Sequence, residues 1–295
     1  MLLPSRPPSI VRPGSLVLLA PTMAEVPQNF LRVDVDPTRH ATVLANLQRL
    51  RGQTYLRDGA ITSEDLTSDG CHVQGADSLS WHVASLREDG SVAACARLRT
   101  HRADSAPGAL GVWSSALARS AAWSDRLWSA IEADLTLARL RGVHYVEFGG
   151  WAVGDEWRRT TMAVTTAMAT YALGECVGGF VGVTTATVRH CSSRMMRKLG
   201  GHSFTAEGVT VPSYFDPQYG CEMELLRFDS KLPAQRYGPM VGHVVGSLLD
   251  VPVLCASRAI DAWSAVSHRS LSGRARYTPV ERLVPCPTAE DLAVA

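Results

Sequence analysis

The chain has 295 residues, of which 46% are hydrophobic and 19% charged, and its formal net charge at pH 7 is +1. This length allows a full hydrophobic core, and the near-zero charge gives no general attraction to nucleic acids or membranes. No run approaches the about 18 consecutive apolar residues of a transmembrane helix. The seven cysteines include no Cys-x-x-Cys pair, which disfavours a disulfide framework and a zinc site. We therefore expect a cytoplasmic globular protein with no metal centre and no membrane contact.

The chain begins with a proline-rich stretch followed by a helix. Residues 1–30 contain six prolines and are expected to lie extended over the surface. Asp36 and Pro37 suit the N-cap and the first position of a helix, and Gly52 is the expected end of that helix.

A hairpin and a second helix are expected next. Apolar runs over residues 79–86 and 91–98 are separated by a turn that ends in Asp89-Gly90, which is a strong hairpin signal. Residues 123–141 then carry apolar side chains at helical spacing.

Two strand–helix units follow the second helix. We expect a strand from Val143, a helix over 158–173, a strand from Val177, a helix over 187–199 and a last strand over 221–228. This order predicts an α/β (α+β) fold in which a mixed, mostly antiparallel central sheet contains a parallel strand–helix–strand crossover.

Three segments are expected along the chain. Residues 1–30 form the extended N-terminal segment, 31–231 the main domain, and 232–295 a C-terminal extension of unknown role. Within the extension, the apolar stretch 241–254 could be a helix, and residues 269–287 are expected to be a loop.

Two glycines, Gly149 and Gly150, interrupt the strand that begins at Val143. Glycine inside a strand marks a bulge or a close approach of another backbone or a ligand. A bulge without any ligand remains open on this evidence alone.

A loop with several hydrogen-bond donors comes soon after these glycines. Arg158, Arg159, Thr160 and Thr161 stand where the next helix is expected to begin, and such a helix start is a ready phosphate site. The alternative is a solvated helix start. Further on, Arg189 belongs to a basic helix face that could contact the phosphates of a ligand or the acidic surface of a partner protein. The alternative is a solvated helix face.

The same strand carries a candidate general base. Strand alternation places Tyr145 and Glu147 on one face, and His144, Val146 and Phe148 on the other. Partial burial beside the apolar residues is expected to raise the pKa of Glu147 towards neutrality. The alternative is a glutamate paired with an arginine.

Signatures of several common enzyme classes are missing. The chain contains no Gly-x-Ser-x-Gly elbow, P-loop, Rossmann glycine fingerprint or His-x-Glu deaminase motif. These absences disfavour the usual hydrolases, NTPases and dehydrogenases.

Over roughly residues 35–229 the chain resembles the GNAT (Gcn5-related) N-acyltransferase superfamily. The matching parts, in order, are Gly149-Gly150, the tripeptide Trp151, Ala152 and Val153, the loop 158–163, and the ending 194–201. The resemblance implies a bulged strand splayed from its parallel neighbour, with helices on both faces of the sheet. The donor's pantetheine arm would pair with the bulged strand, and its pyrophosphate would lie on the following loop, here with Thr161 at the place of the motif's first glycine.

The expected helix between the hairpin and the Glu147 strand is more similar to the branch of acyl-homoserine-lactone synthases and N-acyl amino acid synthases. This resemblance implies Glu147 as the catalytic glutamate and matches Arg97 to an arginine of the branch. We expect Glu147 and Tyr145 to be the catalytic residues, and Arg97 and His144 to bind the substrate. The donor would contact the residues that the motifs supply, namely Trp151, Ala152, Val153, Arg158, Arg159, Thr160, Thr161 and Arg189. A lactone product is not expected, because Gly150 stands where lactone synthases have an arginine. Met196 replaces a tyrosine that often serves as general acid, and this departure, with Thr161, motivates a non-catalytic alternative.

The leading hypothesis is an N-acyltransferase that moves an acyl group from acyl-CoA or an acyl carrier protein to a small-molecule amine by direct attack. One alternative is a non-catalytic protein of the same fold that binds acyl thioesters or a partner. Another uses aminoacyl-tRNA as the donor, which would be the only contact with nucleic acid. Residues 1–30 and 232–295 could cover the acceptor site or form a homodimer contact.

Overall fold

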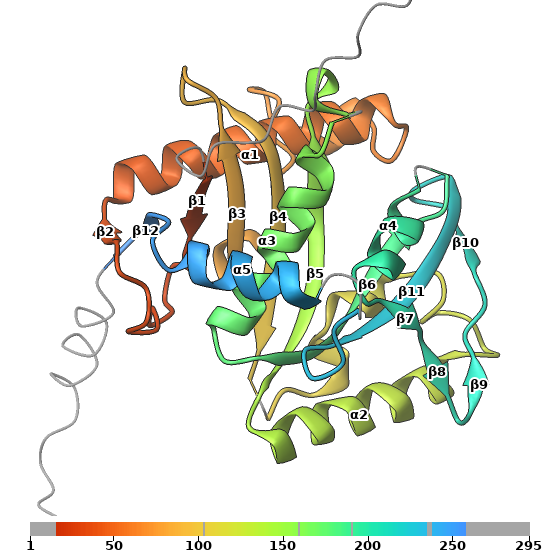
Figure 1. Cartoon of the computed structure of the whole chain (residues 1–295). Helices are drawn as coiled ribbons and strands as arrows, with labels where there is room; N and C mark the ends of the chain where they lie inside the picture. Colours follow the sequence, from red (N-terminus) through yellow and green to blue (C-terminus); the bar gives the residue numbers. More distant parts are fainter. Residues whose placement is uncertain (1–15, 103, 159, 190, 235–237, 258–295) are drawn as a thin grey trace, which may run out of the picture. The chain divides into compact units, whose positions relative to one another are not determined.

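The computed structural model describes residues 16–102, 104–158, 160–189, 191–234 and 238–257. Their main feature is a mixed sheet of ten strands with helices on both faces (Figure 1). The strand order is β10-β11-β6-β5-β4-β3-β1-β12-β2, and β7 pairs with β11.

The elements have the following bounds. The strands of the large sheet are β1 (Leu16–Leu19), β2 (Val33–Val35), β3 (Ser80–Leu86), β4 (Val92–His101), β5 (His144–Val153), β6 (Phe180–Thr187), β7 (His202–Ser203), β10 (Tyr214–Asp216), β11 (Cys221–Asp229) and β12 (Val253–Cys255). Strands β8 (Thr205–Ala206) and β9 (Val209–Thr210) form a separate pair. The helices are α1 (Pro37–Arg57), α2 (Ser124–Arg141), α3 (Met162–Cys176), α4 (Ser192–Lys198) and α5 (Gly238–Leu248).

The predicted fold class is confirmed. Strands β3, β4 and β5 pair antiparallel in succession, as the hairpin signal predicted, and β6 pairs antiparallel with β11. Between these two groups β5 and β6 run parallel, joined by the crossover helix α3.

Each face of the sheet has its own hydrophobic core. Helices α1 and α2 cover one face, where Leu47 packs near Cys95 and Ala152, and Ile131 packs near Tyr145. Helices α3 and α5 cover the other face through a cluster that includes Val146 and Phe180. In Figure 1, α3 and α5 lie in front of the sheet, and α1 and α2 cross behind and below it.

The sheet extends beyond the boundaries expected for the main domain. β1 lies between β3 and β12 with three of its four residues buried, so residues 16–19 are not part of an extended surface segment. At the other end, the apolar stretch expected as one helix over 241–254 divides into α5 and β12. The short apolar segment Leu16–Leu19 forms a strand because it can pair on both edges. The loop expected over 269–287 lies outside the described residues.

Helix α1 does not end at Gly52 but continues to Arg57. A Cβ atom at residue 52 would lie 2.7 Å from the carbonyl oxygen of Gly70, so this glycine allows a loop to pack against the middle of the helix. Two other helices begin later than expected, α3 at Met162 rather than 158 and α4 at Ser192 rather than 187.

Candidate active site

The bulge predicted at the glycines of β5 is present, and Gly150 and Trp151 form it. The register between β4 and β5 shifts between Cys95 and Arg97, so that Ala96 alone lies opposite Gly150 and Trp151. Gly150 has φ of +59°, in the left-handed region that favours glycine. This bulge alters the direction of β5 beyond residue 149.

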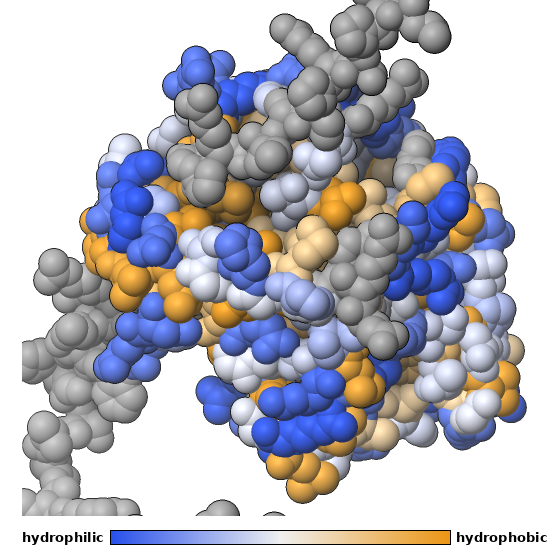
Figure 2. Space-filling view, viewed as in Figure 1, coloured by the Kyte–Doolittle hydropathy of each residue, from blue (hydrophilic) through white to orange (hydrophobic). Residues whose placement is uncertain are grey.

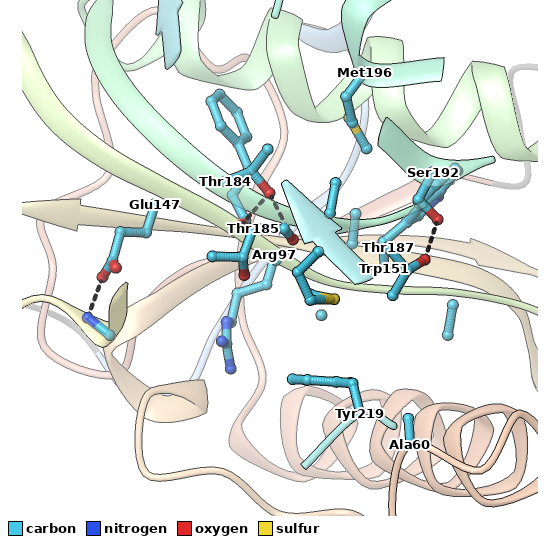
Figure 3. Close-up of a pocket in the computed structure, with 18 of the residues that line it drawn as sticks. Ala60, Arg97, Glu147, Trp151, Thr184, Thr185, Thr187, Ser192, Met196 and Tyr219 are labelled. Atoms are coloured by element: carbon cyan, nitrogen blue, oxygen red, sulfur yellow. Dashed lines mark hydrogen bonds between the residues drawn. The ribbon is translucent and has the colours of Figure 1, made fainter. Parts of the chain in front are cut away.

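From Gly149 onward, just before the bulge, β5 is no longer paired with its parallel neighbour β6. Their pairing ends at Phe148 and Thr184, whereas β5 continues to Val153 and β6 to Thr187. The separation opens a cavity of about 560 Å³ between the two strands (Figure 3).

A buried ion pair supports the bulge from the α1 side. The guanidinium of Arg51, whose side chain is 0% exposed, donates to both carboxylate oxygens of Asp77 at 2.9 and 2.6 Å. Burial alone would raise the pKa of Asp77, but the hydrogen bonds and charge of Arg51 lower it well below its usual range. A Cβ at Gly150 would lie 3.3 Å from Nη1 of Arg51, so the ion pair lies directly beneath the bulge.

The same carboxylate fixes Arg97, a predicted acceptor-binding residue. Nη1 of Arg97 donates to Oδ1 of Asp77 at 3.0 Å and to Oε1 of Gln74 at 2.7 Å. The side chain of Arg97 lines the cavity. Its position is therefore determined by a residue buried behind it.

The cavity has chemically different halves on the two sides of the sheet. We call the part towards α3 and α4 the apolar half, lined by Phe148, Ala167, Tyr171, Met195, Met196, Leu199 and Phe228. We call the part towards α1 and α2 the polar half, lined by Arg97, Arg99, Ser114, Ser115, Glu147 and Tyr219. In Figure 3, Met196 reaches the strands from one side, and Arg97 and Tyr219 lie on the other.

Glu147 lies in the polar half, with a side chain that is 15% exposed. Oε2 accepts hydrogen bonds from Nε2 of His101 at 2.8 Å and from the backbone N–H of Gly111 at 2.9 Å. Oε1 accepts from the backbone N–H of Val112 at 2.9 Å. Arg99 adds a positive charge, with Nη1 3.9 Å from Oε2.

The expected upward shift of the Glu147 pKa is wrong. Burial does favour the protonated form, but hydrogen bonds from His101, Gly111 and Val112 outweigh it and lower the pKa. These donors come from β4 and from a short 3-10 helix, η5 (Gly111–Ser114), which are distant from Glu147 in sequence. Glu147 is therefore an anion at neutral pH.

The structure does not bring Tyr145 and His144 into the cavity. Tyr145 is 1% exposed in the core beneath α2, and its hydroxyl has no hydrogen-bond partner among the described residues. Burial raises its pKa well above the usual value. His144 is exposed at the start of β5, away from the bulge. The cavity opens only where β5 and β6 diverge, and Tyr145 and His144 lie before that point, where the two strands are still paired. The predictions of a catalytic Tyr145 and a substrate-binding His144 therefore do not fit the lining of the cavity.

Arg158 and Arg189 meet at one end of the cavity, which we call the basic end. Both line the cavity, and each donates to Asp58 at the end of α1. Nη2 of Arg158 lies 2.5 Å from Oδ2 of Asp58, and Nη2 of Arg189 lies 2.5 Å from the backbone carbonyl oxygen of Asp58. Arg189 itself precedes α4 and is not on it.

The remaining predicted donor contacts differ in their placement. Trp151, Ala152 and Val153 line the cavity, whereas Thr160 and Thr161 are exposed and do not. Thr161 is the N-cap residue of α3 but makes no side-chain capping bond. Arg159 lies outside the described residues.

The basic face predicted for residues 189–198 is exposed, but part of its charge is already paired within the chain. Among the described side chains of α4, Arg194, Arg197 and Lys198 are exposed, and hydrophilic side chains cover this part of the surface (Figure 2). Nε of Arg197 donates to Glu224 at 3.1 Å, so one of these charges is matched within the chain.

Several lining or supporting residues were not anticipated. Arg99 and His101 follow Arg97 at alternate positions of β4, so the two-residue period could have identified them. Asp58 and Tyr219 had no such signal, since they reach the cavity from the end of α1 and from the β10–β11 connection. In Figure 3, Tyr219 lies beside α1 near Ala60.

Within the described ranges, no group of three or more His, Cys, Asp or Glu side chains could hold a metal ion. None of the helices in that part of the chain is both long and apolar enough to cross a bilayer.

Comparison with known proteins gives similarity of structure only. No model of a protein family matches the chain, and no curated protein matches its sequence. A solved structure of the CoA-dependent acyl-homoserine lactone synthase BjaI, with SAM and isopentyl-CoA, is 13% identical over 79% of this chain and 97% of that chain, with a TM-score of 0.47. That protein is an enzyme of the kind that the sequence resembles.

Two further solved structures are similar. FeeM, an N-acyl amino acid synthase from uncultured soil microbes, is 13% identical over 68% of this chain and 90% of that chain, with a TM-score of 0.40. The AHL synthase LasI is 19% identical over 66% and 86% respectively, with a TM-score of 0.38. Such similarity says nothing of the donor or acceptor of this chain.

Proposed function

We propose that the protein is an N-acyltransferase that moves an acyl group from a thioester, either acyl-CoA or an acyl carrier protein, to a small-molecule amine. The observation that carries this proposal is the cavity between β5 and β6, which joins a basic end, a bulged strand and a carboxylate.

The donor would lie along the separated strands. Beyond Phe148, β5 has no β6 neighbour, and an extended pantetheine arm carries amides that can pair with such a strand edge. Arg158 and Arg189 at the basic end could bind a phosphate of the donor, because a guanidinium can donate several N–H groups to phosphate oxygens. The acyl chain would then occupy the apolar half, where its burial is favourable.

The acceptor amine would enter the polar half beside Glu147. Because Glu147 is ionised, it attracts the ammonium form of the amine. It then takes a proton from the ammonium, directly or through water, and the nitrogen thereby gains the lone pair with which it attacks the thioester carbonyl. A backbone N–H near Trp151 to Val153 would stabilise the oxyanion. The C–N bond forms, the C–S bond breaks, and the leaving thiolate takes up a proton. Alignment of the two reactants supplies much of the acceleration.

Thiol release from a panel of acyl-CoA and acyl-carrier-protein donors, in the presence of mixed amines and amino acids, tests this proposal. We expect Glu147→Gln to lower turnover by ~10²–10⁴-fold while donor binding is retained. The matched control is Glu132→Gln on the exposed surface of α2, which should leave turnover unchanged. Equal turnover in the two variants would show that Glu147 is not the base.

A second candidate function is the non-catalytic binding of acyl thioesters. It is favoured by the three hydrogen bonds that already engage Glu147, since a weakly basic carboxylate is a poorer proton acceptor. A folded protein that binds CoA or carrier protein but releases no thiol with any amine would support this candidate against the enzyme.

A further inference from the structure

The basic end of the cavity contains a carboxylate, Asp58, beside Arg158 and Arg189. Phosphate binding by the arginines does not require this carboxylate. Asp58 caps the C-terminus of α1, and its side chain is 16% exposed. Oδ1 accepts from Nε of Arg57 at 3.0 Å, and Oδ2 accepts from Arg158. The backbone carbonyl oxygen of Asp58 also accepts a hydrogen bond from Arg189. Asp58 therefore connects α1 to the loops that follow β5 and β6.

Asp58 is an anion at neutral pH. Burial would raise its pKa, but the hydrogen bonds from Arg57 and Arg158 lower it. The negative end of the α1 dipole is directed to the same place, because Asp58 follows the last turn of this 21-residue helix. Any phosphate that approaches Arg158 therefore also approaches a carboxylate and a helix C-terminus.

The charges of the described side chains at this end nearly cancel. Arg57, besides its bond to Asp58, pairs with Asp155, and Nε of Arg158 lies 3.8 Å from the same Asp155. Of these described residues, only Asp58, Arg158 and Arg189 line the cavity, so two positive charges there accompany one negative charge. A site of this kind suits a phosphate group with little charge better than one with several charges.

We propose that Asp58 is a specificity-determining residue that selects the thioester donor by its charge. It would favour a phosphopantetheine arm with one phosphate, as carried by a carrier protein, over CoA, whose diphosphate and 3′-phosphate bring several negative charges. This proposal rests on the proposed function and deepens it by naming the class of donor. Arg158 can still bind one phosphate, because a guanidinium has five N–H donors in a planar fork.

A series of pantetheine thioesters tests the role of Asp58, and two of its members, the dephospho-CoA and CoA thioesters, differ only by the 3′-phosphate and therefore in charge. The series is hexanoyl-pantetheine, hexanoyl-phosphopantetheine, hexanoyl-dephospho-CoA and hexanoyl-CoA, each assayed for kcat/KM by thiol release. We expect the wild-type protein to use the phosphopantetheine thioester ~10-fold better than the CoA thioester. Asp58→Asn should raise kcat/KM for hexanoyl-CoA by ~10-fold, with no change for the uncharged pantetheine, because a carboxylate near a phosphate repels it.

Two controls separate charge from structure. Asp104→Asn removes an equivalent charge from an exposed pair with Arg102 and should leave the ratio among donors unchanged. For Asp58→Asn, the gain with CoA should diminish at high salt, since screening weakens charge repulsion at a solvent-accessible site. If Asp58→Asn instead lowers kcat/KM for every phosphate-bearing donor, Asp58 only orients the arginines and the proposal is overturned.

Calorimetric binding of phosphopantetheine, dephospho-CoA and CoA to the full chain gives a readout without turnover. Absence of thiol release with any donor would refute the proposed function but not this selection, which then depends on the affinities. A wild-type affinity for CoA equal to or above that for phosphopantetheine would refute the selection even in an active enzyme.

Discussion

Replacement of Gly150 by alanine should destabilise the protein and distort the cavity. Gly150 has φ of +59°, and a Cβ there would lie 3.0 Å from Cβ of Arg97 and 3.3 Å from Nη1 of Arg51. The left-handed conformation costs an alanine about 1–2 kcal/mol. Neither contact can be relieved easily, because Arg97 belongs to the neighbouring strand and Arg51 is fully buried.

The crowding should add a further cost of about 1–3 kcal/mol, as is typical of overpacked sites. Gly150→Ala is therefore expected to lower the free energy of unfolding by about 2–5 kcal/mol. The matched control is Gly142→Ala, since Gly142 has φ of +64° but no atom within 4 Å of the added Cβ. This control should cost only the about 1–2 kcal/mol of the backbone term.

Urea denaturation followed by circular dichroism measures both free energies. In parallel, donor binding should weaken in Gly150→Ala but not in Gly142→Ala, because only the first glycine forms the wall of the cavity. Equal destabilisation in the two variants would refute the inference that the bulge is packed tightly over Arg51 and Arg97.

Two further predictions concern the charges that surround the cavity. Asp77→Asn should cost about 3–5 kcal/mol in urea denaturation, because it leaves the buried guanidinium of Arg51 without its counter-charge. Asp69→Asn, in an exposed pair with Arg49, should cost much less. Because the pKa of Asp77 is lowered in the folded protein, its ionised carboxylate stabilises the fold at pH values above the unfolded pKa of about 3.9, and this stability is lost as the pH falls below that value. The decrease in the free energy of unfolding at acid pH should therefore be smaller in Asp77→Asn. His101→Ala removes a donor to Glu147 and so should raise the pKa of that carboxylate, which shifts the acid limb of the kcat/KM profile to higher pH. An acid limb at the same pH would show that Glu147 is not the group that titrates.

The sequence was sufficient for features that depend on local patterns. The alternation of side chains, the Asp89-Gly90 turn and the order of strands and helices predicted the hairpin, the mixed sheet and the crossover. The glycine pair at 149–150 predicted the bulge, because few residues other than glycine adopt positive φ inside a strand. The positions of α1 and β12 were less well predicted, since packing against Gly70 and pairing with β1 depend on distant segments.

The electrostatic character of the site was decided by the tertiary structure alone. The residues flanking Glu147 suggested a raised pKa, but donors from positions 101, 111 and 112 lower it. Likewise, the sequence gives no sign that Asp58 meets Arg158, which is 100 residues away. Local sequence determines backbone conformation, whereas a pKa and a binding preference depend on every charge and hydrogen-bond donor within a few ångströms, and folding brings these together from distant parts of the chain.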